Sequence, residues 1–140
     1  MSNARITAEQ EQFVAKRAQY CCEYCFSQVK YSPDPFSIDH IVPRILGGRD
    51  ELDNLAYACL GCNNQKFTAD AATDPVTGER VALYHPRQHN WREHFVWSRD
   101  FAVLIGLTPV GRATIERLQL NREGVVNLRR LLKKVGKHPP

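Results

Sequence analysis

The sequence predicts an α+β protein built from short strands and helices. Three observations favour this class: helical periodicity near both ends of the chain, a strand, loop and helix pattern in its middle, and two close cysteine pairs that bracket this middle part. A chain of 140 residues with 43% hydrophobic content can bury one small core. We therefore expect a single domain over residues 1–140.

The amino-terminal segment predicts a helix over residues 7–20. Thr7 and Gln10 have the spacing of a capping box, in which each side chain bonds the other residue's backbone N–H. The apolar residues expected near one face of this helix are Phe13, Val14 and Ala18.

The middle of the chain, residues 20–72, contains most of the candidate site residues. A strand is predicted over 36–42 and ends at Pro43, which cannot donate a ladder hydrogen bond. A glycine-rich loop follows. A helix is then predicted over 60–72, beginning at the second cysteine pair.

The second half predicts a β extension over 80–105 and a basic helical tail over 108–137. The extension contains a strand at 80–84 and a hairpin that pairs 95–97 with 101–105. Thr108 before Pro109 is typical of a helix start. A last helix from about 123 to 135 is expected to point four apolar residues inward: Val125, Leu128, Leu131 and Leu132. The basic residues expected on or beside its outer face are Arg129, Arg130, Lys133 and Lys134.

The net charge of +4 is unevenly distributed along the chain. Residues 109–140 hold eight Arg and Lys against two Glu, a net charge of +6, whereas residues 1–108 have a net charge of −2. A basic cluster favours a polyanion because binding releases condensed counterions, but solvated basic helix faces are also common. The tail is therefore a candidate phosphate-binding surface or an ordinary solvated one.

The cysteines give the strongest chemical signal. Cys22 and Cys25 are separated by two residues, as are Cys59 and Cys62, and two such pairs supply the four thiolates of a closed tetrahedral zinc site. Such a site has no open coordination position, so its Zn²⁺ is structural and contributes directly to folding. The alternative is four buried cysteines without metal. Cys21 lacks the two-residue spacing to Cys25 and is not assigned to the site.

Cysteines arranged as metal ligands suggest a reducing compartment. The first five residues have no apolar core of a signal sequence, and the apolar runs are only a few residues long. We therefore expect a cytoplasmic protein with no membrane association.

Asp39 and His40 are adjacent near the end of the predicted strand, so their side chains are expected to point in opposite directions. One can then bind a metal while the other transfers a proton. An isolated Asp-His pair is more often a surface or packing feature. Its neighbours in this sequence favour a functional interpretation.

The chain resembles the HNH endonuclease family from residue 20 to about 70. The resemblance rests on the two cysteine pairs and on the following motifs: Asp39-His40-Ile41-Val42-Pro43, Gly47-Gly48, Asn54-Leu55, and Asn63 and Lys66 after the final cysteine. It implies a ββα-metal core, also called a His-Me finger, of two strands and one helix. In members with two cysteine pairs, zinc brackets this core.

The resemblance also implies roles for single residues. Asp39 and Asn63 would bind a catalytic divalent cation, His40 would be the general base, and Asn54 would orient the loop and the histidine. Many members have histidine where this chain has Asn63; the carboxamide oxygen shifts the metal preference toward Mg²⁺ or Mn²⁺. Lys66 either approaches the phosphate or lies solvated on its helix.

The chemistry expected from this set is phosphodiester hydrolysis with one catalytic metal. A neutral imidazole, with a usual pKa near ~6.5, can accept a proton from water at physiological pH. The products would carry 5′-phosphate and 3′-hydroxyl ends, and double-stranded DNA is the expected substrate and partner, whether it is nicked or cut in both strands. The alternatives are a catalytically weak, zinc-stabilised nucleic-acid-binding or adaptor module, and a nuclease directed to RNA.

The second half contains Tyr84-His85-Pro86-Arg87, Trp91, His94-Phe95, Trp97, Gly106-Leu107-Thr108-Pro109 and Gly111-Arg112-Ala113. With these residues it is also similar to an extension found in a subset of small bacterial HNH proteins. The aromatic residues expected to pack in the core or against a sheet are Trp91, Phe95 and Trp97. The histidines to which no role is assigned are His85, His89 and His94.

Overall fold

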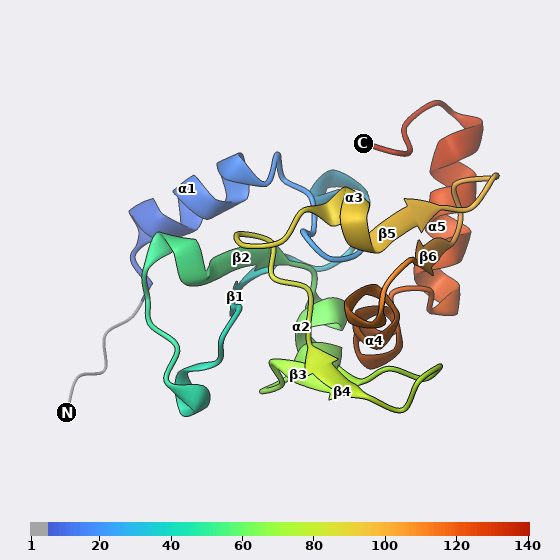
Figure 1. The fold of residues 1–140 in the computed structure, drawn as a ribbon. Coiled ribbons are helices and arrows are strands. Elements are labelled where there is room, and N and C mark those ends of the chain that lie inside the picture. The colour runs from blue at the N-terminus through green and yellow to red at the C-terminus, as the bar shows by residue number, and fades with distance from the viewer. Residues whose placement is uncertain (1–5) are drawn as a thin grey trace.

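The structure is a computed structural model that describes residues 6–140. It consists of short helices and three two-stranded hairpins (Figure 1). In chain order the elements are α1 Ala8–Arg17, β1 Ser37–His40, β2 Leu55–Ala58, α2 Leu60–Lys66, β3 Ala71–Thr73, β4 Arg80–Ala82, α3 Trp91–His94, β5 Phe95–Trp97, β6 Leu104–Gly106, α4 Pro109–Leu118 and α5 Glu123–Lys134. Short 3-10 turns lie at Val29–Tyr31, Arg44–Leu46 and Leu52–Asn54.

The predicted α+β class is confirmed. β1 pairs antiparallel with β2, with Ser37 opposite Ala58 and His40 opposite Leu55, and α2 packs on this hairpin. The hairpin and helix form the two-strand, one-helix unit that the resemblance implied. The second strand had not been recognised from the residue pattern alone.

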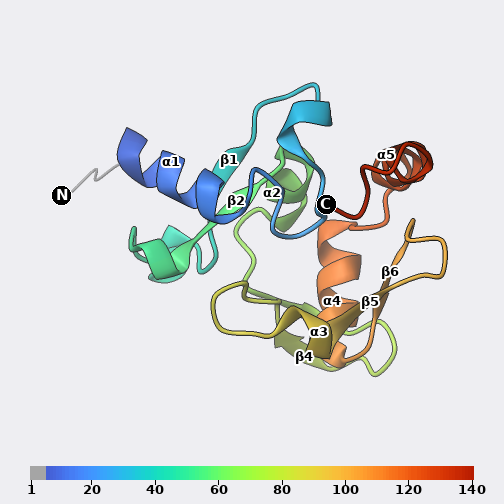
Figure 2. The same ribbon diagram turned by 90° about the horizontal axis from the view of Figure 1, so that it is seen from above.

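The two halves of the chain are packed against each other. In Figures 1 and 2, α4 lies beside α2 and above the β3–β4 hairpin, and α5 lies at the opposite end of the molecule from α1. α4 contacts α2, β3 and β6. A continuous buried cluster joins the four paired cysteines to Phe95, Leu104, Leu118 and Leu120 of the second half. The second half therefore packs directly against the four cysteines.

The predicted amino-terminal helix is confirmed but shorter. Thr7 and Gln10 form the expected capping box. The helix ends at Arg17 because Gln19 and Tyr20 have φ values of 55° and 58°, which no α-helix contains. Val14 is fully buried, whereas Phe13 is 50% exposed.

α2 is also shorter than the expected helix over 60–72. Phe67 has a φ of 51° and ends the helix after Lys66. The last two residues of that prediction, Ala71 and Ala72, belong to β3, which pairs with β4. At the start of the core, β1 stops at His40, two residues earlier than predicted.

The elements of the second half lie close to their predicted positions. β4 occupies the expected strand region, and β5 pairs with β6, with Trp97 opposite Leu104. Thr108 caps α4 by accepting a hydrogen bond from the Gly111 backbone N–H, and Pro109 is the first helical residue. The short helix α3 was not predicted.

α5 has the predicted length but not the predicted inner face. Val125, Val126 and Arg129 are buried, whereas Leu131 is 62% exposed. Arg129 can be buried because both of its Nη atoms donate to oxygen acceptors in the interior. Hydrophobicity alone therefore gave the wrong rotation for this helix. Over residues 6–140, no helix is both long enough and apolar enough to cross a membrane.

Candidate functional site: a cysteine cluster beside an Asp-His pair

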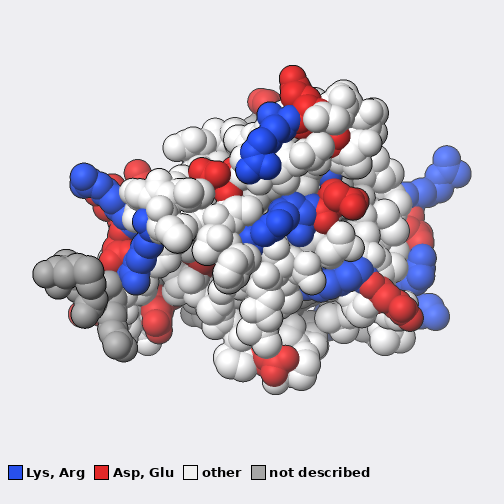
Figure 3. Space-filling model, turned by 90° about the horizontal axis from the view of Figure 1, so that it is seen from below, with Lys and Arg blue, Asp and Glu red and all other residues white. Residues whose placement is uncertain are grey.

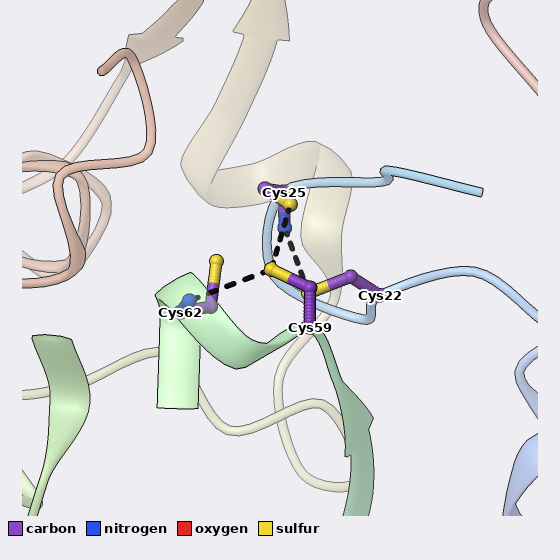
Figure 4. Close-up of side chains that lie close together, drawn as sticks. All are labelled: Cys22, Cys25, Cys59 and Cys62. Atoms are coloured by element: carbon purple, nitrogen blue, oxygen red, sulfur yellow. Dashed lines mark hydrogen bonds between the residues drawn. The ribbon is translucent and has the colours of Figure 1, made fainter. Parts of the chain in front are cut away.

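The four paired cysteines converge although 33 residues separate the two pairs. Cys22 and Cys25 lie in the turn after α1, Cys59 caps α2, and Cys62 is in its first turn. The side chains are buried and face one another (Figure 4). All four sulfur atoms lie within 4.8 Å of one another, and the Sγ atoms of Cys25 and Cys59 are 3.6 Å apart.

This geometry fits a zinc ion. A tetrahedral site with Zn–S bonds of about 2.3 Å places its sulfur atoms about 3.8 Å apart. Backbone N–H groups already support two of the sulfurs: Cys25 N–H donates to Cys22 Sγ at 3.5 Å, and Cys62 N–H donates to Cys59 Sγ at 3.4 Å. The cluster is consistent with a structural zinc.

The pKa values of the cluster cysteines are shifted in opposite directions. Burial raises the pKa of Cys22, whereas a hydrogen bond from Cys22 lowers the pKa of Cys25 to about 7 and that of Cys59 further. Some of the thiols thus favour the thiolate form that a metal requires. Cys21 is buried but its Sγ donates to the Gln19 carbonyl at 3.4 Å, away from the cluster.

Asp39 is a buried carboxylate in contact with a buried ammonium group. It is 4% exposed, and Lys66 Nζ lies 3.1 Å from its Oδ2 and 3.3 Å from its Oδ1. The Tyr24 hydroxyl donates to Oδ2 at 2.7 Å. Burial raises the pKa of Asp39, and the positive charge of Lys66 opposes this increase. Two carbonyls, those of His40 and Ile41, also accept from Lys66, each at 3.0 Å.

His40 points away from Asp39 and toward the surface. Its side chain is 17% exposed, and its Nε2 lies 2.7 Å from Asp50 Oδ1. Arg44 donates to the same oxygen from Nε at 3.0 Å, with Nη2 at 2.9 Å. The hydrogen bond to His40 lowers the pKa of Asp50. Asp50 is therefore ionised at neutral pH and can only accept, so His40 Nε2 is the donor.

Asn54 fastens the loop between His40 and β2. Its Oδ1 accepts from the Val42 N–H at 2.9 Å, and its Nδ2 donates to the carbonyls of Val42 and Arg49 at 3.0 and 2.8 Å. Gly48 permits this close approach, because an added Cβ there would lie 1.6 Å from the Val42 carbonyl oxygen. The loop that carries Asp50 is thus held from inside.

Asn63 follows the last cluster cysteine on α2. Its Nδ2 donates to Ser37 Oγ on β1 at 2.7 Å, and its backbone N–H donates to the Cys59 carbonyl at 3.0 Å. The same short helix therefore presents Cys62, Asn63 and Lys66, so the position of the cysteine cluster fixes the other two side chains against β1.

The comparison with protein families matches this segment. Residues 22–68 fit the family described as HNH endonuclease. These residues form an HNH domain. The match begins at the first cluster cysteine and ends just after Lys66. Membership suggests phosphodiester hydrolase activity on nucleic acids. A search of curated proteins found no match to the chain.

Two predicted phosphate-binding residues of the protein are in its interior. Lys66 of the HNH domain is 1% exposed and bound to Asp39, so neither the phosphate-binding nor the solvated interpretation is correct. Arg129 is 3% exposed. It donates to four acceptors at 2.8–3.1 Å: Ala102 O, Asn121 Oδ1, Cys25 O and Leu120 O. These hydrogen bonds join α5 to the HNH domain at Cys25 and to two segments of the second half.

The remaining basic residues of α5 are on the surface. The Arg130 side chain is 54% exposed, with Nε 3.8 Å from Asp100, while Lys133 lies over the Phe101 ring and Lys134 is exposed. On the face of the molecule drawn in Figure 3, Lys and Arg side chains are interspersed with Asp and Glu. Phosphate binding by these three α5 residues stays a prediction.

The aromatic residues outside the HNH domain are packing residues, as predicted. Phe95 is buried, and Trp91 and Trp97 pack against the core cluster. His89 Nδ1 accepts from the His85 N–H at 2.9 Å, and His94 Nδ1 lies 2.6 Å from Thr108 Oγ1. Among the described residues, the four cysteines alone have the proximity of a metal-binding group.

Sequence reasoning missed several neighbours of the HNH motif residues. Tyr24 contacts Asp39, Asp50 contacts His40, and Arg44 donates to Asp50, yet none of the three has a motif spacing that distinguishes it. Arg122, which donates to two cluster sulfurs, had no signal at all.

Proposed function

We propose that the HNH domain makes this protein a metal-dependent DNA endonuclease in which His40 is the general base. The observation that carries the proposal is the hydrogen bond between His40 Nε2 and the ionised Asp50. With Nε2–H donating to Asp50, the lone pair of a neutral imidazole is on Nδ1. Asp50 thus orients the ring and stabilises the imidazolium that forms after proton transfer.

The loop around His40 supports this role. Asn54 bonds the backbone of Val42, and its own carbonyl accepts from the Ile41 N–H at 2.9 Å, immediately after the histidine. A base held by the backbone on one side and by Asp50 on the other needs little reorganisation when it accepts a proton. His40 takes a proton from the attacking water at Nδ1.

The donors beside His40 suit a hard divalent cation. Asp39 and Asn63 offer carboxylate and carboxamide oxygens, which Mg²⁺ and Mn²⁺ prefer. Asp39 already stabilises a positive charge, since its two oxygens contact Lys66 Nζ. A divalent cation at Asp39 therefore requires Lys66 to give up part of this contact. When bound, the cation supplies Lewis-acid stabilisation of the phosphate oxygens and of the leaving 3′-oxygen.

The zinc assignment has a separate function within this proposal. Cys62 and Asn63 are adjacent on α2, so zinc at the four cysteines fixes the start of the helix that presents a ligand of the catalytic cation. Removing zinc is expected to abolish cleavage although zinc takes no part in the reaction.

The test is cleavage of supercoiled plasmid with Mg²⁺ or Mn²⁺ by wild type, His40→Ala and Asp50→Asn, with EDTA as a metal-free reaction. His89→Gln serves as the matched control, because His89 lies in the extension. We expect wild type and the control to nick or linearise the plasmid, His40→Ala to be inactive and Asp50→Asn to be slower by about 10²–10⁴-fold in rate.

A parallel reaction with single-stranded and duplex RNA distinguishes the substrate. Faster RNA cleavage that also depends on His40 would keep the mechanism and replace DNA by RNA. Plasmid and RNA left intact in every metal, together with retained DNA binding, would contradict the enzyme and favour the adaptor module.

A further inference from the structure

Arg122 lies across the second cysteine pair of the cluster. Its Nη2 donates to Cys59 Sγ at 3.4 Å and its Nη1 donates to Cys62 Sγ at 3.5 Å. Nη1 is also within hydrogen-bonding distance of the carbonyls of Leu118 and Gln119, at 3.4 and 3.1 Å. The guanidinium group is therefore anchored at the end of α4 and bridges two sulfur atoms more than 55 residues away in the sequence.

Gly61, between the two cysteines, makes room for this approach. A Cβ added at Gly61 would lie 2.5 Å from Arg122 Nη2 and 2.9 Å from its Cζ. Glycine inside a helix is less favourable than alanine. Close contact with the guanidinium group accounts for a glycine at this helical position.

A second guanidinium group approaches the first cysteine pair. Arg129 Nη2 donates to the Cys25 carbonyl at 3.1 Å from a buried position. A zinc ion with four thiolates has two negative charges in excess, and these two arginines of the carboxy-terminal segment bring two positive charges to it. Hydrogen bonds from charged donors are strongest where water is excluded.

We propose that Arg122 is a positioning residue of the zinc centre. Its two N–H···S hydrogen bonds stabilise Cys59 and Cys62 as zinc-bound thiolates and retain the metal, so that the carboxy-terminal segment is part of the centre. The inference rests on zinc binding by the four cysteines, and it does not depend on nuclease activity. Outer hydrogen bonds to metal ligands typically contribute about 10–100-fold to metal affinity.

The first measurement is zinc affinity by competition with a chelator, using full-length protein whose zinc content has been determined. The variants are Arg122→Gln, Arg122→Lys and Gly61→Ala, and Arg130→Gln is the matched control on the exposed face of α5. We expect Arg122→Gln to weaken zinc binding about 10–100-fold. Arg122→Lys should retain part of the affinity, and the control should equal wild type.

Gly61→Ala separates the contact from the charge. It keeps Arg122 but displaces its guanidinium group from the sulfurs, so it should weaken zinc binding as Arg122→Gln does. Combining both substitutions should cost no more than Arg122→Gln alone, because the same hydrogen bonds are lost. Additive losses would mean that Gly61→Ala acts on the backbone between Cys59 and Cys62, and they would contradict the proposed contact.

The second measurement is the thiolate-to-metal charge-transfer band of the Co²⁺-substituted protein. Hydrogen bonds lower the energy of the sulfur lone pairs, so Arg122→Gln should shift this band to lower energy, and Arg130→Gln should not. A general loss of stability would not produce such a shift in a protein that still binds four-coordinate Co²⁺.

Three outcomes distinguish the hypotheses. Wild type that carries zinc, with variants unchanged in affinity and spectrum, would overturn the role of Arg122 alone. Wild type purified without zinc, and unable to bind Co²⁺ through its thiolates, would overturn both the zinc assignment and this inference. Wild type that cleaves no plasmid, together with the expected loss of zinc affinity and the expected spectral shift in Arg122→Gln, would support this inference and contradict only the proposal for His40.

Discussion

The cysteine cluster and the Asp39–Lys66 pair are both buried charged centres, but they are balanced differently. The positively charged groups beside the cluster are the guanidinium groups of Arg122 and Arg129, which lie outside the HNH domain. Asp39 is balanced by Lys66 within that domain. The first centre therefore links the HNH domain to the carboxy-terminal segment, whereas the second is complete within residues 22–68. Substitutions should reveal this difference as distinct losses of stability.

The largest effect is expected from Cys59→Ser. This change removes one thiolate from the cluster, while the serine hydroxyl can still cap α2, so the expected loss comes from the metal. Structural zinc contributes about 10–16 kcal/mol of apparent binding energy to folding in small domains. We expect loss of bound zinc together with unfolding or precipitation. Zinc content by mass spectrometry and circular dichroism measure both. Cys21→Ser, a buried cysteine outside the cluster, is the control and should retain zinc. Full metal content and an unchanged melting temperature in Cys59→Ser would contradict the four-cysteine zinc site.

Lys66→Met should give the next largest effect. It leaves the Asp39 carboxylate buried without its cation, a change that typically costs about 3–5 kcal/mol. Urea unfolding of Lys66→Met and of Lys134→Met, an exposed lysine on α5, measures the difference. Replacing both partners, as in Lys66→Met with Asp39→Leu, should recover much of the loss, because no unpaired charge then remains. A loss in the double variant as large as in Lys66→Met would show that packing, and not charge, is responsible.

The contrast between the two centres also explains what the sequence predicted. The two-residue spacing within each cysteine pair identifies the pairs in the sequence, and all four members of the cluster were predicted. Asp39, His40, Asn54 and Asn63 were placed by motif. Partners such as Asp50, Arg122 and Tyr24 become neighbours only through tertiary packing, so no local pattern identifies them.

The fold was predictable to a similar extent for similar reasons. Caps and turn residues located the starts of α1 and α4 because Thr7 and Thr108 act on their own helices. Helix ends at Arg17 and Lys66 depend on residues with positive φ that are not glycine, and composition does not reveal them. The rotation of α5 depends on four acceptors for Arg129 that lie in three other segments of the chain.

The anchoring of α5 can be tested by substituting two adjacent residues of that helix, the buried Arg129 and the exposed Arg130. Arg129→Met leaves several buried carbonyls without a donor, each at a cost of about 1–3 kcal/mol, so we expect a marked fall in the free energy of unfolding. Arg130→Met should change it by less than about 0.5 kcal/mol, since exposed ion pairs contribute little. Among folded proteins, Arg130→Met should weaken DNA binding more than Arg129→Met does. Equal stability of the two variants would refute the proposed anchoring of α5.

The smallest effect concerns the two carboxyl groups that flank His40. Burial raises the pKa of Asp39, while the hydrogen bond from His40 lowers the pKa of Asp50. A carboxyl group with a lowered folded-state pKa stabilises the protein above its unfolded pKa of about 3.9 and loses this contribution as pH falls through the folded value. His40→Ala should therefore raise the pKa of Asp50 toward its ordinary value and make unfolding slightly less sensitive to acid below about pH 4. Carboxyl ¹³C chemical shifts followed from pH 7 to 2 measure both groups. Lys66 and Tyr24 lower the pKa of Asp39 more than the charge of His40 does, so the titration of Asp39 should move less than that of Asp50. Equal shifts of both carboxyl groups would mean that His40 does not distinguish them.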